Sequence, residues 1–349
     1  MSAAPSAAVT PPPTIAKTAS PSPTPAPTPK PTFPPGLHVA RPALDHPGGT
    51  LELLEGTATL QQKLEFAGVG YDISADLFVS TTFTELVLVR TDGTRQQVKV
   101  PGLYALGRPS LSPDAKQVLL QATSSSFTPA PGVQRPLDDT VWIVDLATGA
   151  SRRIGDVPTS PATQGEQPVW FPSGDRVAYW TTEDNCLVIK VRDVATARDL
   201  LTIRRGGVSG CYQPQRGILD GPRFHVSVSH DSARILIPGQ MQLYDAKTGA
   251  LVGDIHQKVL DGVAAAGYKP DARFPGAAGG GTLPLSAAFS PDDKQIAFDG
   301  AVEKDGAYGV ALFRINVDGT NFTVLRPLVQ VEPKLSNGHN YSQLLPHWR

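Results

Sequence analysis

The chain has 349 residues and a formal net charge of −1, with 40% hydrophobic and 18% charged residues. This composition is ordinary for a folded protein and excludes global disorder. The near-neutral charge, and the lack of any run of Lys or Arg interleaved with aromatic residues, argue against a nucleic-acid partner. No apolar run approaches the roughly 18 residues needed to cross a bilayer, so we expect a chain that does not span a membrane.

The first 36 residues are almost entirely Pro, Ala, Ser and Thr, with Lys17 and Lys30 as the only charged side chains. Such a segment cannot build a core and favours polyproline II, so residues 1–36 are predicted to be a stiff tether and residues 37–349 the folded domain. Tethers of this kind often separate a module from a membrane or wall anchor; a disordered tail without an anchoring role is the alternative. Because the segment lacks the features of a signal peptide, either an export signal has been removed or the protein is not exported.

A strand, a tight turn and a second strand recur four times along the chain. In each copy Pro or His precedes Asp, Ser or Gly between two apolar stretches, which is typical of hairpin turns. The turns are Ser112–Asp114, Phe171–Asp175, Ser229–Asp231 and Ser290–Asp293, and the apolar stretches after them are Val118–Leu120, Val177–Trp180, Ile235–Ile237 and Ile296–Phe298.

Each hairpin is followed by a second pattern, in which an alternating apolar strand runs into an Asp-x-x-Thr-Gly or Asp-Gly-Thr turn. The copies are Asp145–Gly149, Asp245–Gly249, Asp318–Thr320 and Asp92–Thr94, with Asp193–Thr196 as a degenerate copy. Each repeat therefore supplies four short antiparallel strands.

The spacing of the repeats predicts the fold. Ser112, Phe171, Ser229 and Ser290 lie 59, 58 and 61 residues apart, and Asp72–Ser80 resembles a shortened earlier copy. Four-stranded units repeated in this way indicate an all-β protein, a β-propeller, for which we expect six four-stranded blades. A last strand at Leu344–Trp348 has no hairpin after it, so its partners should come from the amino-terminal segment, with Leu51–Leu54 and Leu60–Phe66 as candidates.

These motifs resemble the TolB-like, or WD-like, propeller repeats of bacterial periplasmic and secreted proteins. The resemblance rests on Ser290–Phe298, Ile315–Thr320 and Leu344–Trp348 and covers residues 71–349. It implies a module that binds another protein, often through the channel mouth or one loop-rich face, and it implies no shared catalytic residues. No TolB-type α/β domain fits before Tyr71, so assembly with a Tol-type envelope system is not implied.

The sequence offers no recognisable catalytic or cofactor motif. The seven histidines are scattered, and His230 holds the turn position that Pro occupies in other copies, which favours a surface role. Gly207–Cys211 fails the last position of a nucleophile elbow, and the Gly-rich segment 276–281 lacks the Lys-Ser/Thr pair of a phosphate loop. We therefore expect no catalytic, cofactor or metal residues.

Three acidic pairs offer oxygen ligands of the kind that calcium prefers, although acids at hairpin turns more often cap backbone groups. The pairs are Asp138–Asp139, Glu183–Asp184 and Asp292–Asp293.

Two cysteines flank a predicted hairpin. Antiparallel pairing of its strands would bring Cys186 and Cys211 close enough for a disulfide in an oxidising compartment. Two buried, inert thiols are the alternative.

Two insertions are candidates for partner contact. A short helix is predicted within Lys258–Tyr268, ended by Gly267 and by Pro270 beyond it, with a Gly-rich loop after it. The second insertion, Thr123–Leu137, is rich in Ser and Pro. The candidate contact residues are Ser124, Phe127, Gln134, Lys258, Tyr268, Arg273 and Phe274. Tolerated surface decoration is the alternative for both insertions.

The sequence as a whole favours a non-catalytic binding or scaffold module of the bacterial cell envelope, periplasmic or extracellular and tethered through its amino terminus, whose partner is another protein. One alternative is a propeller enzyme, such as a metal-dependent lactonase or esterase with acids in the central channel. The other is a carbohydrate or peptidoglycan binder, which needs exposed aromatic platforms; Trp142, Trp170 and Trp180 fall on predicted strands and are expected in the core.

Overall fold

The computed structural model describes residues 35–42, 49–55, 71–74, 76–104, 106–124, 140–156, 167–184, 186–204, 226–271, 286–330 and 345–348. The chain divides into Met1–Lys30 and Pro31–Arg349, and all described residues fall in the second unit. Most of the predicted tether and the candidate strand Leu60–Phe66 therefore lie outside the described residues, and the boundary at residue 36 stays a prediction.

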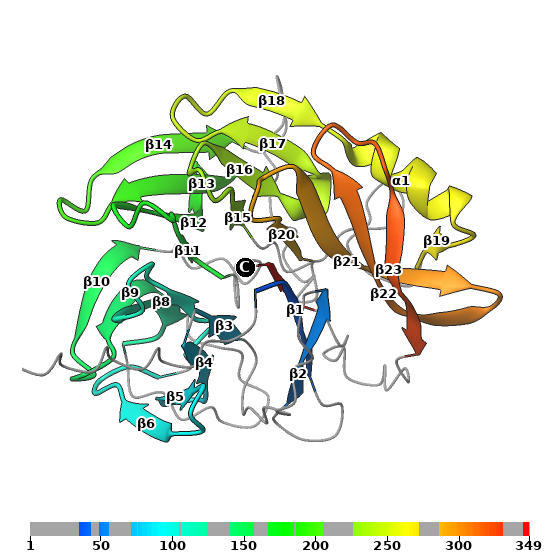
Figure 1. Cartoon of the computed structure of the whole chain (residues 1–349). Helices are drawn as coiled ribbons and strands as arrows, with labels where there is room; N and C mark the ends of the chain where they lie inside the picture. The colour runs from blue at the N-terminus through cyan, green and yellow to red at the C-terminus, as the bar shows by residue number, and fades with distance from the viewer. Residues whose placement is uncertain are drawn as a thin grey trace, which may run out of the picture. The chain divides into compact units, whose positions relative to one another are not determined.

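Five antiparallel sheets, each of four or five strands, follow one another along the chain and lie around a common centre (Figure 1). Blade 1 contains β3 (Tyr71–Ile73), β4 (Leu77–Thr81), β5 (Glu85–Arg90) and β6 (Arg95–Lys99). Blade 2 contains β7 (Ser110–Leu111), β8 (Gln117–Ala122), β9 (Thr140–Asp145) and β10 (Ser151–Asp156). Blade 3 contains β11 (Val169–Trp170), β12 (Arg176–Glu183), β13 (Cys186–Asp193) and β14 (Asp199–Arg204).

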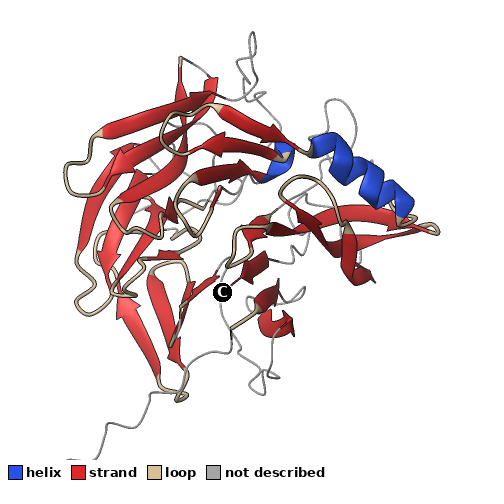
Figure 2. Cartoon of the chain, turned by 45° about the horizontal axis from the view of Figure 1, so that its top comes forward, coloured by secondary structure: helices blue, strands red, loops and turns tan. Residues whose placement is uncertain are grey.

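The next two blades carry the insertion with the helix. Blade 4 contains β15 (Ser227–Val228), β16 (Arg234–Ile237), β17 (Gln242–Asp245) and β18 (Leu251–Asp254), with the 3-10 turn η2 (Pro238–Gln240) between β16 and β17. Blade 5 contains β20 (Ala287–Phe289), β21 (Gln295–Lys304), β22 (Ala307–Asn316), β23 (Thr323–Gln330) and the short β19 (Lys269–Pro270). The predicted helix is confirmed as α1 (His256–Ala265), which lies at the periphery (Figure 2).

A further sheet joins the two ends of the propeller. It contains β2 (Gly49–Glu55), β1 (Leu37–Pro42) and β24 (Leu345–Trp348), in the order β2-β1-β24. Leu37 pairs with Trp348 and His38 with His347. The prediction that strands from both ends meet is thus confirmed, although the strand beside β24 is β1, and Leu51–Leu54 lies in β2.

The all-β propeller is confirmed, but the prediction of six four-stranded blades is wrong in detail. Five blades have four or five strands, whereas the sheet at the chain ends has three among the described residues. The physical reason is that the last repeat supplies one strand instead of a complete hairpin pair, so this sheet depends on what the amino-terminal segment adds.

The repeated turns form as the sequence predicts. The Ser112 hydroxyl donates to Asp114 Oδ1 at 2.7 Å and accepts the Gln117 N–H at 2.9 Å. The same pair of bonds recurs at Ser229 and Ser290. The fourth residue of each turn has a positive φ, which Gly174 adopts without strain and which other copies give to Ala115, Ser232 and Asp293.

Hydrophobic cores lie between neighbouring sheets. Val79 of blade 1 packs with Val118 of blade 2 in one cluster, and Trp180 of blade 3 shares a cluster with Ile235 of blade 4. Three further clusters join blade 2 to blade 3, blade 4 to blade 5 with α1, and blade 5 to β1. Each blade therefore depends on its neighbours for burial, as radial packing requires.

Innermost strands contact one another in order around the centre, from β3 through β7, β11, β15 and β20 to β24. From β24 the ring continues to β3 through an ion pair between His347 and Asp72. This arrangement brings one short strand from each sheet to the centre, and the sheet β2-β1-β24 contributes β24.

Candidate functional site

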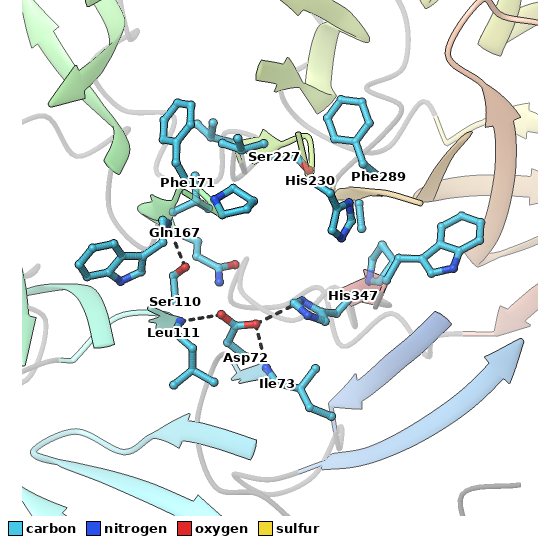
Figure 3. Close-up of a pocket in the computed structure, with 18 of the residues that line it drawn as sticks. Asp72, Ile73, Ser110, Leu111, Gln167, Phe171, Ser227, His230, Phe289 and His347 are labelled. Carbon is cyan, nitrogen blue, oxygen red and sulfur yellow. Dashed lines mark hydrogen bonds and ion pairs between the residues drawn. The ribbon is translucent and has the colours of Figure 1, made fainter. Parts of the chain in front are cut away.

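A cavity of about 550 Å³ lies where the innermost strands converge. We call it the central pocket. Its wall is formed by β3, β7, β11, β15, β20 and β24 together with residues of the turns that follow some of them, so each blade contributes (Figure 3). The spacing of the repeats creates this pocket, because the same segment of each copy ends at the same place.

The wall of the central pocket is mainly apolar, and it carries little charge. The described residues that line it include no Lys, Arg or Glu, and its titratable side chains besides Tyr71 are Asp72, His230 and His347. Five serines and one amide supply further hydrogen-bonding groups, and four aromatic rings besides Tyr71 supply apolar surface: Ser74, Ser110, Ser112, Ser227, Ser286, Gln167, Trp170, Phe171, Phe289 and Trp348. A wall of this kind suits a ligand with apolar side chains and amide groups.

Asp72 connects three strands at the edge of this pocket. Its Oδ1 accepts the Ile73 N–H at 2.8 Å and lies 3.2 Å from Nδ1 of His347, and its Oδ2 accepts the Leu111 N–H at 2.6 Å. Only 8% of Asp72 is exposed. Burial raises the pKa of Asp72 to about 7 from 3.8, because loss of hydration outweighs the two backbone N–H groups, which lower it.

His230 occupies the opposite part of the wall. Its Nδ1 lies 3.2 Å from Oδ1 of Asp293, a carboxylate that also accepts the backbone N–H groups of His230 and Asp231 at 2.7 and 2.9 Å. Arg234 donates to the backbone carbonyl of Asp293 at 2.9 Å. The turns of blades 4 and 5 are thereby joined, and the half-exposed His230 is both a turn residue, as predicted, and a pocket residue.

The two acidic pairs that the structure describes interact with other groups of the chain. Asp292 accepts from the Ser290 hydroxyl at 2.7 Å and from the Lys294 N–H at 3.2 Å, so it caps its turn. Glu183 pairs with Lys190 and Arg204 at 2.8 and 2.9 Å. Asp138 and Asp139 lie outside the described residues. Within the described ranges, no group of three or more His, Cys, Asp or Glu side chains is arranged to hold a metal ion.

The candidate contact residues do not gather in one place among the described residues. Ser124 is exposed at the end of blade 2, and Lys258 is exposed on α1, where its Nζ donates to the Asp318 carbonyl at 2.5 Å. Tyr268 is only 3% exposed and packs edge-on against Phe313 at 5.6 Å, so its side chain belongs to the core. The remaining candidates, Phe127, Gln134, Arg273 and Phe274, lie outside the described residues.

Cys186, at the start of β13, is disulfide-bonded. Cys211 lies outside the described residues, so the pairing of these two cysteines stays a prediction. Peptide mapping under non-reducing conditions tests it directly.

Asp72 and His347 are site residues that were not predicted from the sequence, although the repeat contains a signal for Asp72. Asp72 lies two residues before its turn, where other blades have Ser110, Val169, Ser227 and Ala288. A carboxylate at a position that is otherwise small or apolar departs from the repeat and marks a special environment. His347 gives no comparable signal, because its repeat is incomplete.

The three tryptophans expected in the core differ in exposure. Trp180 and Trp170 are buried at 1% and 7% exposure, which agrees with the prediction. Trp142 is half-buried, and its indole N–H donates to Thr140 at 2.5 Å. Trp170 also lines the central pocket, so a core residue contributes to the wall of the site.

Among the described residues, none of the helices combines the length and apolar character that crossing a bilayer requires.

No family model matches the chain, and no curated protein matches it in sequence. Among solved structures, TolB from Acinetobacter baumannii is similar with a TM-score of 0.54 and 14% identity, over 90% of this chain and 66% of that chain. This chain therefore spans just under two thirds of that protein. A nidogen/laminin complex matches with a TM-score of 0.49 and 9% identity, over 89% of this chain and 97% of the other. Hydrazine synthase from Kuenenia stuttgartiensis matches with a TM-score of 0.42 and 13% identity, over 80% of this chain and 77% of the other. At these identities the similarity concerns the fold alone, and by its repeats, sheets and similarity to TolB this chain has a TolB-like β-propeller fold.

Proposed function

We propose that this protein is a non-catalytic binding module of the bacterial cell envelope, which holds a segment of a partner protein in its central pocket. The observation that carries the proposal is the convergence of every blade on one cavity whose wall is aromatic and hydrogen-bonding. Its volume of about 550 Å³ lies within the range of about 300–1,000 Å³ that is common for ligand sites. The resemblance of the repeats to TolB-like propellers supports a protein as the partner.

The wall chemistry indicates what such a segment offers. Trp170, Phe171 and Phe289 present apolar surface. An apolar side chain of the partner that fits between such aromatic rings buries a large area, which favours binding. Ser227 and Gln167 present groups that pair with backbone amides. The Gln167 amide is already held by the Pro109 carbonyl at 2.7 Å, so its position is fixed before a partner arrives. We infer a partner segment that is predominantly apolar and extended.

The finer features of the proposal follow from the sequence. We propose that residues 1–36 are a Pro-rich tether through which the module is held at the periplasmic or outer face of the envelope. A position at the end of a stiff tether suits a scaffold that presents one face to a membrane-associated assembly.

The test replaces one small residue of the pocket wall with a large, positively charged side chain. Ser227→Arg, on β15, fills the central pocket with a side chain that an apolar segment cannot accommodate. Ser124→Arg makes the same change at an exposed position outside the pocket. Wild type and both variants are used for affinity capture from the native envelope fraction.

We expect the wild type and Ser124→Arg to capture the same protein and Ser227→Arg to lose it. Equal capture by Ser227→Arg contradicts binding at the pocket, and loss in Ser124→Arg transfers the contact to the segment between β8 and β9 of blade 2. No reproducible capture by the wild type contradicts a binding module. Thermal unfolding of each variant establishes that it is folded.

The pair of Asp72 and His347 favours a second candidate, a propeller hydrolase, because a histidine beside a buried carboxylate can act as a general base. Activated esters and lactones are the substrates to screen, with His347→Gln as the control. Turnover by the wild type that the variant loses supports the enzyme, and equal background rates contradict it.

A further inference from the structure

The strand β24 in the wall of the central pocket has more contacts on its blade 5 side than on its blade 1 side. β24 packs against β20 and β21 of blade 5, and it reaches blade 1 through the ion pair between His347 and Asp72. We call the boundary between β24 and β3 the seam. Both sides of the seam line the pocket, with Pro346, His347 and Trp348 on one side and Tyr71–Ile73 on the other. Movement at the seam therefore changes the shape of the pocket.

The contact at the seam depends on protons. A carboxylate only accepts hydrogen bonds, and Asp72 already receives the N–H groups of Ile73 and Leu111. At the 3.2 Å approach between Nδ1 of His347 and Oδ1 of Asp72, a neutral imidazole with its proton on Nδ1 can donate to the carboxylate. One further proton, held by either His347 or Asp72, cancels the net negative charge of this buried pair and strengthens the contact. With His347 at 34% side-chain exposure and Asp72 buried, solvent can deliver and remove this proton through the pocket.

The elements next to the seam carry further titratable groups. β1 contributes His38, which is fully buried and directly opposite His347 in the register. The segment before β7 contributes the buried Arg108, and β21 contributes the buried Asp299, whose Oδ1 accepts the N–H and hydroxyl of Ser286, both at 2.7 Å. β4 and β20 have no titratable residues. The pair His230–Asp293 belongs to another part of the wall.

We propose that the seam is a proton-controlled latch: one titratable proton, held jointly by Asp72 and His347, neutralises this buried pair and holds β24 against blade 1, and its loss at alkaline pH loosens this wall of the pocket. The latch is a regulation of the site in the proposed function, and only its effect on a partner rests on that function.

The sign of the effect follows from linkage. The pKa of Asp72 is about 7 when the seam is closed, and opening returns the carboxyl to water, where its ordinary pKa is 3.8. A closed seam therefore retains a proton that an open seam releases, so closure is favoured at low pH. That advantage is lost progressively as the pH rises from about 4 to 7. A proton on His347 acts in the same direction, because the imidazolium balances the buried carboxylate in the closed seam.

Hydrogen exchange of the full chain, without a partner, tests the latch. Amide protection in β24 and β3 is compared at pH 5.5 and pH 8 after correction for the intrinsic exchange rates, with β12 and β13 as the internal reference. We expect protection at the seam to fall by about tenfold or more relative to the reference, since one proton changes an opening equilibrium by up to tenfold per pH unit. Constant relative protection, or a rise with pH, overturns the proposal.

Two variants assign the effect. Asp72→Asn keeps the size of the side chain and a carbonyl acceptor but cannot titrate, so the pH dependence at the seam should disappear. His230→Gln removes an imidazole that has the same 3.2 Å contact to a carboxylate in the same pocket but away from the seam, so the pH dependence should persist. An unchanged pH dependence in Asp72→Asn contradicts the latch. The wild-type measurement decides the question even if that variant does not fold.

The experiment separates the latch from the proposed function. Exchange is measured without a partner, so a latch can be found in a protein that captures nothing. Conversely, a protein that captures a partner through the pocket equally well at pH 5.5 and pH 8, with constant protection at the seam, has the function but not the latch.

Discussion

Two kinds of aspartate in this protein accept similar hydrogen bonds, yet their pKa values move in opposite directions. At the turn of blade 2, Asp114 accepts the Ser112 hydroxyl and the Lys116 N–H, and the Ser112 bond is the main reason that its pKa lies below the ordinary value. At the seam, Asp72 also accepts two N–H groups, yet its pKa is raised to about 7. The difference is hydration, since Asp114 is largely exposed and Asp72 is buried.

The two carboxylates also differ in where their partners lie in the chain. Ser112 and Lys116 are both two residues from Asp114, so the turn forms from local sequence. Leu111 is 39 residues from Asp72, and His347 is near the other end of the chain. The turns are thus self-contained units, whereas the seam exists only when distant segments have met. We expect perturbations of the seam to have larger effects than perturbations of a turn.

The largest effect is expected from removal of Leu345–Arg349. This deletion removes β24, leaves β1 without one neighbour and leaves the buried Asp72 without His347. Leaving a buried charge without its partner alone costs about 3–5 kcal/mol. Chemical denaturation should show a free energy of unfolding lowered by more than about 3 kcal/mol, and a change below 1 kcal/mol would mean that the ring does not depend on its closure.

The next effect concerns the core behind the seam. Leu37 of β1 is fully buried and packs with Val310 and Leu312 of blade 5, so Leu37→Ala should lower the free energy of unfolding by about 2–5 kcal/mol. Leu251→Ala makes the same change at an outer strand where the side chain is 52% exposed, and it should stay within about 0.5 kcal/mol. Similar losses in both variants, measured by denaturant titration, contradict the packing of β1 against blade 5.

The same contrast explains how much of the structure the sequence could predict. The turns were predictable because the Ser–Asp bonds, as at Ser112 and Asp114, join residues two positions apart and recur in several copies. The number of complete blades was not predictable in this way, because the last repeat supplies one strand to a sheet that depends on what the amino-terminal segment adds. β1 ends at Pro42 and follows a Pro-rich segment, so its composition hid a strand whose pairing with β24 is entirely long-range.

The central pocket follows from the repeat, but its chemistry does not. The spacing of the copies implies that equivalent segments meet at the centre, and Ser110 and Ser227 occupy equivalent positions there. Which acid meets which histidine depends on the closing of the ring, so the pair of Asp72 and His347 could not be derived from spacing. His230 was placed correctly in a turn, and only the structure shows that this turn borders the pocket.

A smaller effect is expected where the turns of one blade touch the next. Gly149 has φ +72°, and a Cβ there would lie 2.3 Å from the Lys99 carbonyl oxygen of blade 1. Gly306 has φ +78° but nothing within 4 Å. Gly306→Ala should therefore cost only the backbone strain of about 1–2 kcal/mol, and Gly149→Ala at least about 1 kcal/mol more because backbone atoms clash. If thermal unfolding shows the same loss of stability in Gly149→Ala and Gly306→Ala, the neighbouring blades can move apart at this turn without cost.

The smallest effect separates the two kinds of aspartate by pH. Ser112→Ala removes the hydroxyl that donates to Asp114, with an expected loss of about 0.5–1.5 kcal/mol at pH 7. Because the pKa of Asp114 is lowered in the folded protein, its stabilising contribution is present above the ordinary value of 3.8 and is lost as the pH falls through the folded pKa. The difference in the free energy of unfolding between wild type and Ser112→Ala should therefore shrink between pH 5 and pH 3.

For Asp72 the sign is opposite, since its raised pKa makes folding more favourable as the pH falls from 7 towards 4. Denaturation at pH 7, 5 and 3 distinguishes the two: His347→Gln should change the pH dependence of unfolding above pH 4, and Ser112→Ala should change it below pH 4. If both variants change the pH dependence of unfolding in the same pH interval, burial does not account for the opposite pKa shifts of Asp72 and Asp114.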